Sequence, residues 1–377
     1  MTLPIWDLFC RVVDNYGDIG VCWRLARALT HEHGIAVRLW VDDLACFAPL
    51  CPTLRPERSC QELEGVQVHR WADTPPPDWQ PGAVAVEAFA CTLPDAWQRA
   101  LRGATPAPLW INLEYLSAED WVAGCHGLAS PQGGGITKYF FFPGFTPDTG
   151  GLLREADLMA RRDAWREADA RAWLAGRLKV PPLPGALRVS LFAYEQPPLQ
   201  PLVETWRRST SPVQVLVPPG KVVPALSQAL GIPALRVGER HTSGTLTVQG
   251  IPFLPQSEYD LLLWSCDLNF VRGEDSFVRA QWAQRPFVWQ IYPQEAGAHH
   301  IKLDAFLARY LAQWPAGEAA VLAACWRAWN GAGNLDAAAL LPLLPSWNVH
   351  ALRWGAQLVH SGELAANLVS FARSRLQ

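Results

Sequence analysis

Short apolar runs, each followed by a turn and then by a helical pattern, recur along the chain, and this alternation limits the fold more than any other feature. The first run is Ile5 to Cys10, a helical pattern extends from Ile19 to about His33, and the next run is Ala36 to Val41. Parallel strands need a crossover between them, so apolar runs that alternate with helices are typical of a parallel sheet. The alternation restarts at Leu187, after a proline-rich segment at 181–185. The pattern therefore predicts an α/β protein with two Rossmann-like halves.

The chain has 377 residues, which is enough for two domains with separate cores. We predict an N-terminal domain at 1–180, a C-terminal domain at 181–359, and a last helix at 360–377 that packs back on the first domain. Two Rossmann-like domains facing each other across a cleft describe the GT-B fold of nucleotide-sugar glycosyltransferases. Fold alone does not define the chemistry, because other two-domain α/β proteins share this arrangement.

Composition excludes several classes of protein. Half of the residues are hydrophobic and 18% are charged, as in globular proteins. The net charge of −3 argues against nucleic-acid binding, and no apolar stretch reaches the roughly 18 residues of a membrane span. The first residues lack the basic and apolar regions of a signal peptide. Nine cysteines without paired spacing predict reduced thiols, a cytoplasmic location and no metal site.

The strongest local signal lies near residue 272. An apolar run from Cys266 to Val271 is followed by Arg272-Gly-Glu-Asp-Ser276, and a helical pattern begins at Phe277. A strand, a glycine-bearing turn and a helix start aim backbone N–H groups at an anion, and a guanidinium suits phosphate. In this interpretation Asp275 or Ser276 caps the helix. The alternative is a capped corner in which Arg272 and Glu274 pair with each other.

A second group of polar residues follows the first strand. Asp14 and Asp18 lie in the loop Asp14-Asn-Tyr-Gly-Asp-Ile-Gly20, at the carboxyl end where doubly wound sheets bind ligands. Taken singly, Asp18 reads as a helix N-cap and Asp14 as a turn former. Glu114 and Tyr115 follow another expected strand at the same edge, where they either contact an acceptor or merely end the strand.

Several motifs together resemble one family. They are Asp14-Asn-Tyr-Gly-Asp-Ile-Gly20, Asn112-Leu-Glu-Tyr115, Thr137-Lys-Tyr-Phe-Phe-Phe-Pro-Gly-Phe145, Gly150-Gly-Leu-Leu-Arg-Glu155 and Arg272-Gly-Glu-Asp-Ser276. They span nearly the whole chain and resemble the EarP family of bacterial protein-arginine rhamnosyltransferases, which modify translation elongation factor P. The resemblance implies a GT-B fold, dTDP-β-L-rhamnose as donor, inversion at the anomeric carbon and no metal or other cofactor. It also implies an arginine acceptor on elongation factor P, which helps ribosomes through polyproline stretches.

By this resemblance, residues of both halves take roles. Asp14, Asp18 and Glu274 are the catalytic candidates, with Asp18 as base and Asp14 as its orienting partner. Glu114 and Tyr115 are the candidates for acceptor binding. The residues expected to bind dTDP-rhamnose are Tyr16, Gly17, Phe192, Tyr194, Phe253, Gln256, Arg272, Asp275 and Ser276.

The chemistry fits these residue types. A guanidinium keeps its proton up to a pKa above roughly 12, so a carboxylate pair can clamp it and accept a proton as the new bond forms. We expect a monomer whose partner is elongation factor P, with no nucleic acid and no membrane. Two alternatives remain at this stage: a GT-B transferase for a lipid or small-molecule acceptor, and a non-catalytic protein that binds a nucleotide sugar.

Overall fold

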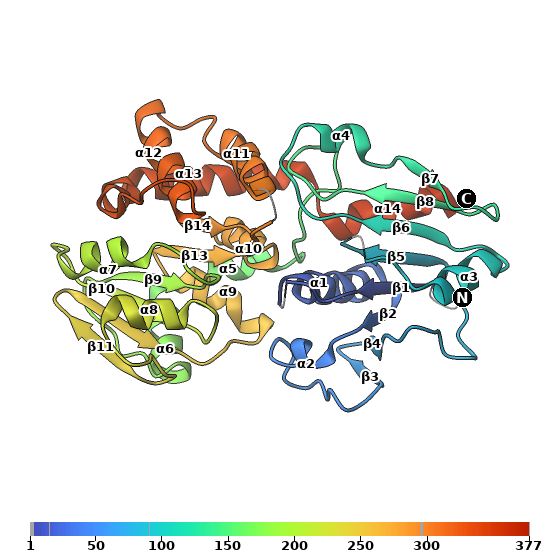
Figure 1. The fold of residues 1–377 in the computed structure, drawn as a ribbon, viewed down its shortest axis with the longest axis horizontal. Helices are drawn as coiled ribbons and strands as arrows, with labels where there is room; N and C mark the ends of the chain where they lie inside the picture. The colour runs from blue at the N-terminus through green and yellow to red at the C-terminus, as the bar shows by residue number, and fades with distance from the viewer. Residues whose placement is uncertain (1–3, 15, 90, 295–296, 377) are drawn as a thin grey trace. The chain divides into compact units, whose positions relative to one another are not determined.

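The computed structural model describes residues 4–14, 16–89, 91–294 and 297–376, which form two compact units. The first unit comprises residues 1–156 and 358–377, and the second comprises residues 157–357. Each unit is built on one sheet, as Figure 1 shows. No helix in the described ranges is long and apolar enough to cross a membrane.

The first sheet has eight strands in the order β3-β4-β2-β1-β5-β6-β8-β7. Six of them, from β4 to β8, run parallel, and the strands at the two edges are antiparallel. The strands are β1 (Ile5–Cys10), β2 (Ala36–Val41), β3 (Cys60–Leu63), β4 (Val66–Arg70), β5 (Val84–Ala88), β6 (Leu109–Leu113), β7 (Ala129–Pro131) and β8 (Thr137–Phe141). The helices of this unit are α1 (Tyr16–His33), α2 (Leu44–Phe47), α3 (Asp95–Gly103), α4 (Trp121–Cys125), the short η3 (Val359–Ser361) and α14 (Leu364–Leu376).

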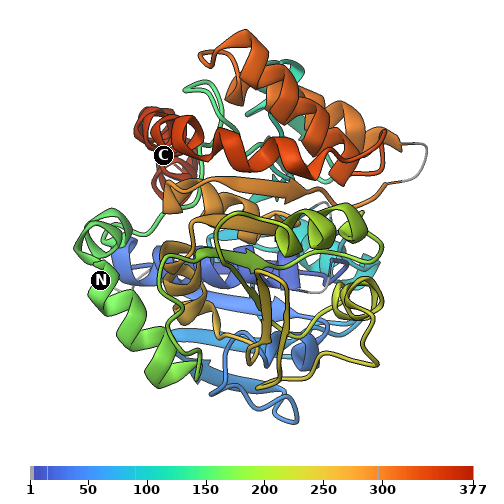
Figure 2. The same cartoon turned by 90° about the vertical axis from the view of Figure 1, so that its left-hand side faces the viewer.

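The second sheet has six strands in the order β11-β12-β10-β9-β13-β14. The strands are β9 (Leu187–Leu191), β10 (Val213–Val217), β11 (Arg240–Ser243), β12 (Leu246–Gly250), β13 (Leu268–Arg272) and β14 (Phe287–Gln290). The helices are α5 (Leu158–Ala164), α6 (Glu167–Arg177), α7 (Leu199–Arg207), α8 (Val223–Leu230), α9 (Gln256–Ser265), α10 (Asp275–Ala283), α11 (Ala298–Tyr310), α12 (Ala316–Trp329), η2 (Ala337–Ala339) and α13 (Leu340–Leu358). Figures 1 and 2 show α11, α12 and α13 gathered beside β14, where Phe306 and Trp326 stack with ring centroids 5.8 Å apart.

Both sheets reverse their order at one point. In the first sheet the chain builds outward from β1 to β2 and β4, and then returns to the other side of β1 with β5. The second sheet does the same, with β10 on one side of β9 and β13 on the other. Crossovers diverge at such a point and leave a crevice at the carboxyl ends of the two central strands. The fold therefore places any ligand site of each unit after β1 and β5, or after β9 and β13.

The unit boundary lies at residue 157, whereas the sequence predicts it at residue 181. Two helices precede the proline-rich segment, because the chain is extended at Trp165 and Arg166 between α5 and α6. The apolar side chains of Leu174 and Leu178 pack in a core cluster with residues of the second unit, including Leu216 and Ile251. A helix that buries its apolar face against the second sheet belongs with that sheet.

The last helix packs within the first unit. The α14 helix lies against α1, and Leu364 N–H donates to the Leu152 carbonyl at 3.2 Å. The Glu363 carboxylate accepts from the amides of Ala365 and Ala366 at 2.9 and 2.7 Å. These bonds satisfy orphan N–H groups of the first helical turn and fix where α14 begins.

Candidate active site

The loop after β1 is folded around the carboxylate of Asp18. One oxygen, Oδ2, accepts hydrogen bonds from the backbone N–H groups of Val13 and Asp14, both at 2.8 Å. Asp18 is 2% exposed and lies in the first turn of α1, which begins at Tyr16. The expectation that Asp18 precedes the helix as its N-cap is therefore wrong. Its side chain instead holds the loop segment that carries Asp14.

Asp14 is half-buried beside Gly17. The Gly17 N–H donates to the Asp14 carbonyl at 2.7 Å, and a Cβ at residue 17 would stand 2.7 Å from Asp14 Oδ2. Glycine at this position thus leaves room for the carboxylate. Asn15, which also belongs to the predicted loop, lies outside the described residues.

Burial raises the pKa of Asp18 above its usual value, although hydrogen bonds from the Asp14 and Val13 amides and from the Tyr115 side chain oppose the shift. Tyr115 follows β6 at the same edge of the sheet, and its ring stacks on Phe89 with centroids 4.7 Å apart. Glu114 accepts a hydrogen bond from Asn112. The structure thus brings Asp14, Asp18 and Tyr115 to one edge, with Asp18 more basic than an ordinary aspartate.

In the second unit Arg272 occupies the corresponding point. It is the last residue of β13 and is 5% exposed. Its guanidinium carbon lies 4.5 Å from the ring centroid of Phe192 and 4.5 Å from that of Tyr194, both of which follow β9. Among the described residues Arg272 forms no ion pair, and its Nη1 is buried without a hydrogen-bond partner. The predicted alternative of an Arg272–Glu274 pair is therefore wrong.

The turn after Arg272 leads directly into α10. Gly273 has a positive φ of 62°, which glycine adopts at no steric cost. Glu274 is the N-cap residue but makes no side-chain capping bond, so the expectation that Asp275 or Ser276 caps this helix is wrong. Ser276 Oγ instead accepts from Arg272 N–H at 3.0 Å and donates to the Arg272 carbonyl. These bonds fix the backbone of Arg272 beside the positive end of the α10 dipole.

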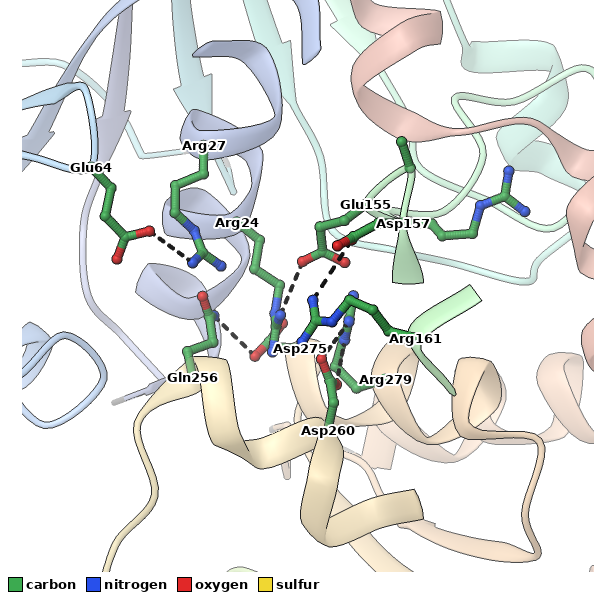
Figure 3. A network of polar contacts seen from close by, with 12 residues as sticks. Arg24, Arg27, Glu64, Glu155, Asp157, Arg161, Gln256, Asp260, Asp275 and Arg279 are labelled. Carbon is green, nitrogen blue, oxygen red and sulfur yellow. Dashed lines mark hydrogen bonds and ion pairs between the residues drawn. The ribbon is translucent and has the colours of Figure 1, made fainter. Parts of the chain in front are cut away.

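Side-chain contacts join the helices α9 and α10 beside this turn, as Figure 3 shows. Asp260 and Arg279 form a bidentate ion pair with distances of 2.8 and 2.6 Å, and their side chains are 4% and 1% exposed. Nearer the helix starts, Gln256 Nε2 donates to Asp275 Oδ2 at 3.3 Å. The pairs fix the register between α10 and the segment with Phe253 and Gln256. Sequence reasoning missed Asp260 and Arg279, although charged residues at buried helix positions are a usable signal.

Two further predicted residues lie at the starts of helices. Tyr16 is the first residue of α1, and Phe253 is half-buried before α9. Within the described residues, no group of three His, Cys, Asp or Glu side chains is arranged to hold a metal ion. The buried charge after β1 is the carboxylate of Asp18, and the buried charge at the end of β13 is the guanidinium of Arg272.

The fold and this charge arrangement define the class of protein. The chain has two Rossmann-like units, and a guanidinium and a helix N-terminus lie where the second sheet reverses its strand order. This is the arrangement of a GT-B glycosyltransferase, and a solved structure shares the architecture. That structure concerns EarP-mediated arginine glycosylation of translation elongation factor EF-P. It matches with a TM-score of 0.70 and 40% identity over 99% of each chain.

The family model of the elongation factor P rhamnosyltransferase EarP matches residues 6–373. The protein-arginine rhamnosyltransferase of Pseudomonas putida is 52% identical, over 98% of this chain and 99% of that protein. The enzyme of the same name from Pseudomonas aeruginosa is 49% identical, over 97% and 98%. The chain therefore belongs to the EarP family and is a glycosyltransferase.

Replacing Gly17 with alanine tests the placement of Asp14. The added Cβ would collide with Asp14 Oδ2, so we expect transferase activity to fall by at least about tenfold while the fold persists. Activity and the thermal midpoint of unfolding should be measured together. Gly103→Ala is the control, since a Cβ there meets nothing within 4 Å. Full activity in Gly17→Ala would show that the carboxylate position is unimportant.

Proposed function

We propose that this enzyme transfers rhamnose from dTDP-β-L-rhamnose to an arginine side chain of elongation factor P, with inversion and without a metal ion. The rhamnosyl group and the arginine acceptor are supported by the family and by the names of the relatives. The observation that carries the donor half is the buried Arg272 guanidinium, with one nitrogen unpartnered among the described residues.

A diphosphate fits the surroundings of Arg272. Leaving a buried charged donor unsatisfied is costly, and an anionic oxygen is the partner that a guanidinium binds most strongly. Phe192 and Tyr194 hold the guanidinium plane, and the N-terminus of α10 adds a partial positive charge. In the proposed complex, Asp275 and Ser276 lie beside the sugar diphosphate, and Phe253 and Gln256 face the thymine.

The carboxylates of the first unit suit a guanidinium acceptor. In the proposed step the bond between the anomeric carbon and the diphosphate oxygen breaks, and a bond from a guanidinium nitrogen forms on the opposite face. The nitrogen loses one proton, which Asp18 accepts, while Asp14 orients the group and localises its charge. The raised pKa of Asp18 makes it a better proton acceptor than an ordinary aspartate. Glu274 is the further catalytic candidate, and Tyr16, Gly17, Glu114 and Tyr115 complete the proposed contacts.

Departing dTDP gains negative charge, and without a metal ion the protein itself must stabilise that charge. Arg272 and the α10 N-terminus provide it in the proposal. In the proposal the enzyme acts as a monomer in the cytoplasm and binds neither membrane nor nucleic acid.

The reaction is tested by intact mass of elongation factor P after incubation with the enzyme and dTDP-rhamnose, with and without EDTA. We expect the mass of one deoxyhexose to be added in both cases. Asp18→Asn should lower the rate at least about 100-fold, because an amide oxygen can hold the loop but cannot take the proton. Binding of dTDP should persist in this variant. Binding of dTDP without any transfer to elongation factor P would refute the acceptor and favour a different one.

The pH dependence follows from the raised pKa of Asp18. A carboxylate cannot act as a base once it is protonated, so kcat/KM should fall as the pH falls through this raised pKa. The acid limb should therefore lie above 3.8, the usual value for aspartate. Initial rates at low acceptor concentration between about pH 4 and pH 8 locate the limb, with dTDP binding as the control for unfolding. A flat profile down to about pH 4 would argue against Asp18 as the base.

Arg272→Met tests the donor half. Removing a guanidinium that bonds a diphosphate should weaken dTDP binding by about 10- to 100-fold, as measured by calorimetry. The dTDP affinity of Arg272→Lys should lie between those of the wild-type enzyme and Arg272→Met, since lysine keeps the charge and loses the planar stacking. Arg327→Met is the control, because Arg327 pairs with Asp304 on the surface of the same unit. Equal affinities in all variants would place the diphosphate elsewhere.

A further inference from the structure

One tryptophan is exposed, whereas the others are buried or, at Trp165 and Trp173, half-buried. All 19 lie in the described part, and among them Trp121 alone is exposed, with 51% of its surface accessible. It begins the short helix α4, which Figure 1 shows beside the β7 and β8 edge of the first sheet. The next residue, Val122, is 1% exposed. The helix is therefore anchored in the core while its indole faces outward.

The surroundings of Trp121 form one apolar surface. Its ring packs edge-on against Phe142 with centroids 5.5 Å apart, and Phe142 stacks with Phe140 at 6.4 Å. Phe140 N–H donates to the carbonyl of Leu128, which is 53% exposed. Residues opposite each other on paired chains point to the same face. We call these four residues, Trp121, Leu128, Phe140 and Phe142, the aromatic ledge: Trp121 and Leu128 are its exposed members, Phe140 is half-buried, and the buried Phe142 supports Trp121.

The ledge is held rigidly by hydrogen bonds from both sides. His126, which follows α4, accepts the Phe142 N–H on Nδ1 at 3.0 Å. Gly127 N–H donates to the Phe140 carbonyl at 2.7 Å. A rigid aromatic surface loses little conformational freedom when a partner covers it, which is why such side chains dominate the energetics of interfaces.

The ledge lies on the edge of the sheet that presents the two aspartates. Phe142 directly follows the last residue of β8, and Asp14 follows the end of β1. The strands β1, β5, β6 and β8 are parallel neighbours in this order, so all of their carboxyl ends lie on one edge. Three strand spacings separate β8 from β1, a distance of about 14 Å.

We infer that the aromatic ledge is a docking surface for the protein that carries the acceptor arginine. An ordinary protein interface covers about 800 Å² on each partner, a disc of about 16 Å radius. A protein whose arginine reaches Asp14 and Asp18 covers an area wide enough to include the ledge, whereas a small acceptor bound at the aspartates does not. Trp121 is the residue type that most often anchors such an interface. This inference rests on the proposed function and specifies how the acceptor is recognised.

The test compares full-length Trp121→Ala with the wild-type enzyme. The dissociation constant of elongation factor P, measured by calorimetry without donor, and its KM should both rise about 10- to 30-fold. The kcat at saturating acceptor should stay within about twofold, and dTDP affinity should be unchanged, because the indole touches neither donor nor reacting atoms. Trp121→Phe should recover part of the affinity. Leu352→Ala is the matched control, since Leu352 is 54% exposed on α13 of the second unit.

Two outcomes separate this inference from the proposed function. Transfer by the wild-type enzyme with an acceptor KM that changes less than about twofold in Trp121→Ala would overturn the docking surface and leave the reaction intact. No transfer to elongation factor P by the wild-type enzyme would overturn the proposed function and the docking surface with it. Where Trp121→Ala lowers the thermal midpoint strongly, Leu128→Ser is judged by the same KM criterion.

Discussion

The whole arrangement depends on the point in each sheet where the strand order reverses. Between β1 and β5, and again between β9 and β13, the crossovers turn away in opposite directions and expose the carboxyl ends of two strands. The first point is lined by Asp14 and Asp18 and the second by Arg272. The same topology therefore supports opposite electrostatics, and the sign of the charge after each strand decides which half suits a cation and which suits an anion.

Two buried charges differ in how far the fold itself satisfies them. Asp7 is fully buried, yet its carboxylate accepts from Trp40 Nε1 and Gly82 N–H, both at 2.8 Å, and pairs with Arg38 at 2.7 Å. Arg272 is almost as buried, but its Nη1 has no partner among the described residues. A protein interior normally satisfies such groups, because an unsatisfied one is destabilising by about 1–3 kcal/mol. The fold thus accounts for the first charge, and the proposed function assigns the diphosphate of the donor to the second.

The sequence predicted the parallel core of both units, because buried strands such as Val84–Ala88 are mostly apolar, with Glu87 as the one charged residue of that strand. It missed the edge strands β3 and β11, whose residues are half exposed and polar. A hairpin signal was nevertheless present, since Glu64 and Gly65 adopt positive φ values in the turn between β3 and β4.

The other misses concern contacts that local patterns cannot report. The proline-rich segment at 181–185 resembles a linker, but the preceding helix α6 shares the core of the second unit. In the sequence Asp18 resembles an N-cap, because aspartate is favoured both at the N-cap and within the first turn of a helix. The sequence pattern predicted that Arg272 lies at the end of a strand. Its stacking between Phe192 and Tyr194 could not be predicted, because it depends on two strands that meet only in the folded protein.

Asp18 combines a structural role with the proposed chemical one, and the two are separable because they use different properties of the carboxylate. Holding the loop requires one acceptor oxygen, since the Val13 and Asp14 amides both donate to Oδ2. Taking a proton requires a basic group, and burial supplies this by raising the pKa. The loop amides work against that shift, because they stabilise the ionised form. The loop amides thus favour the carboxylate form of Asp18, and burial favours the basicity that the proposed proton transfer requires.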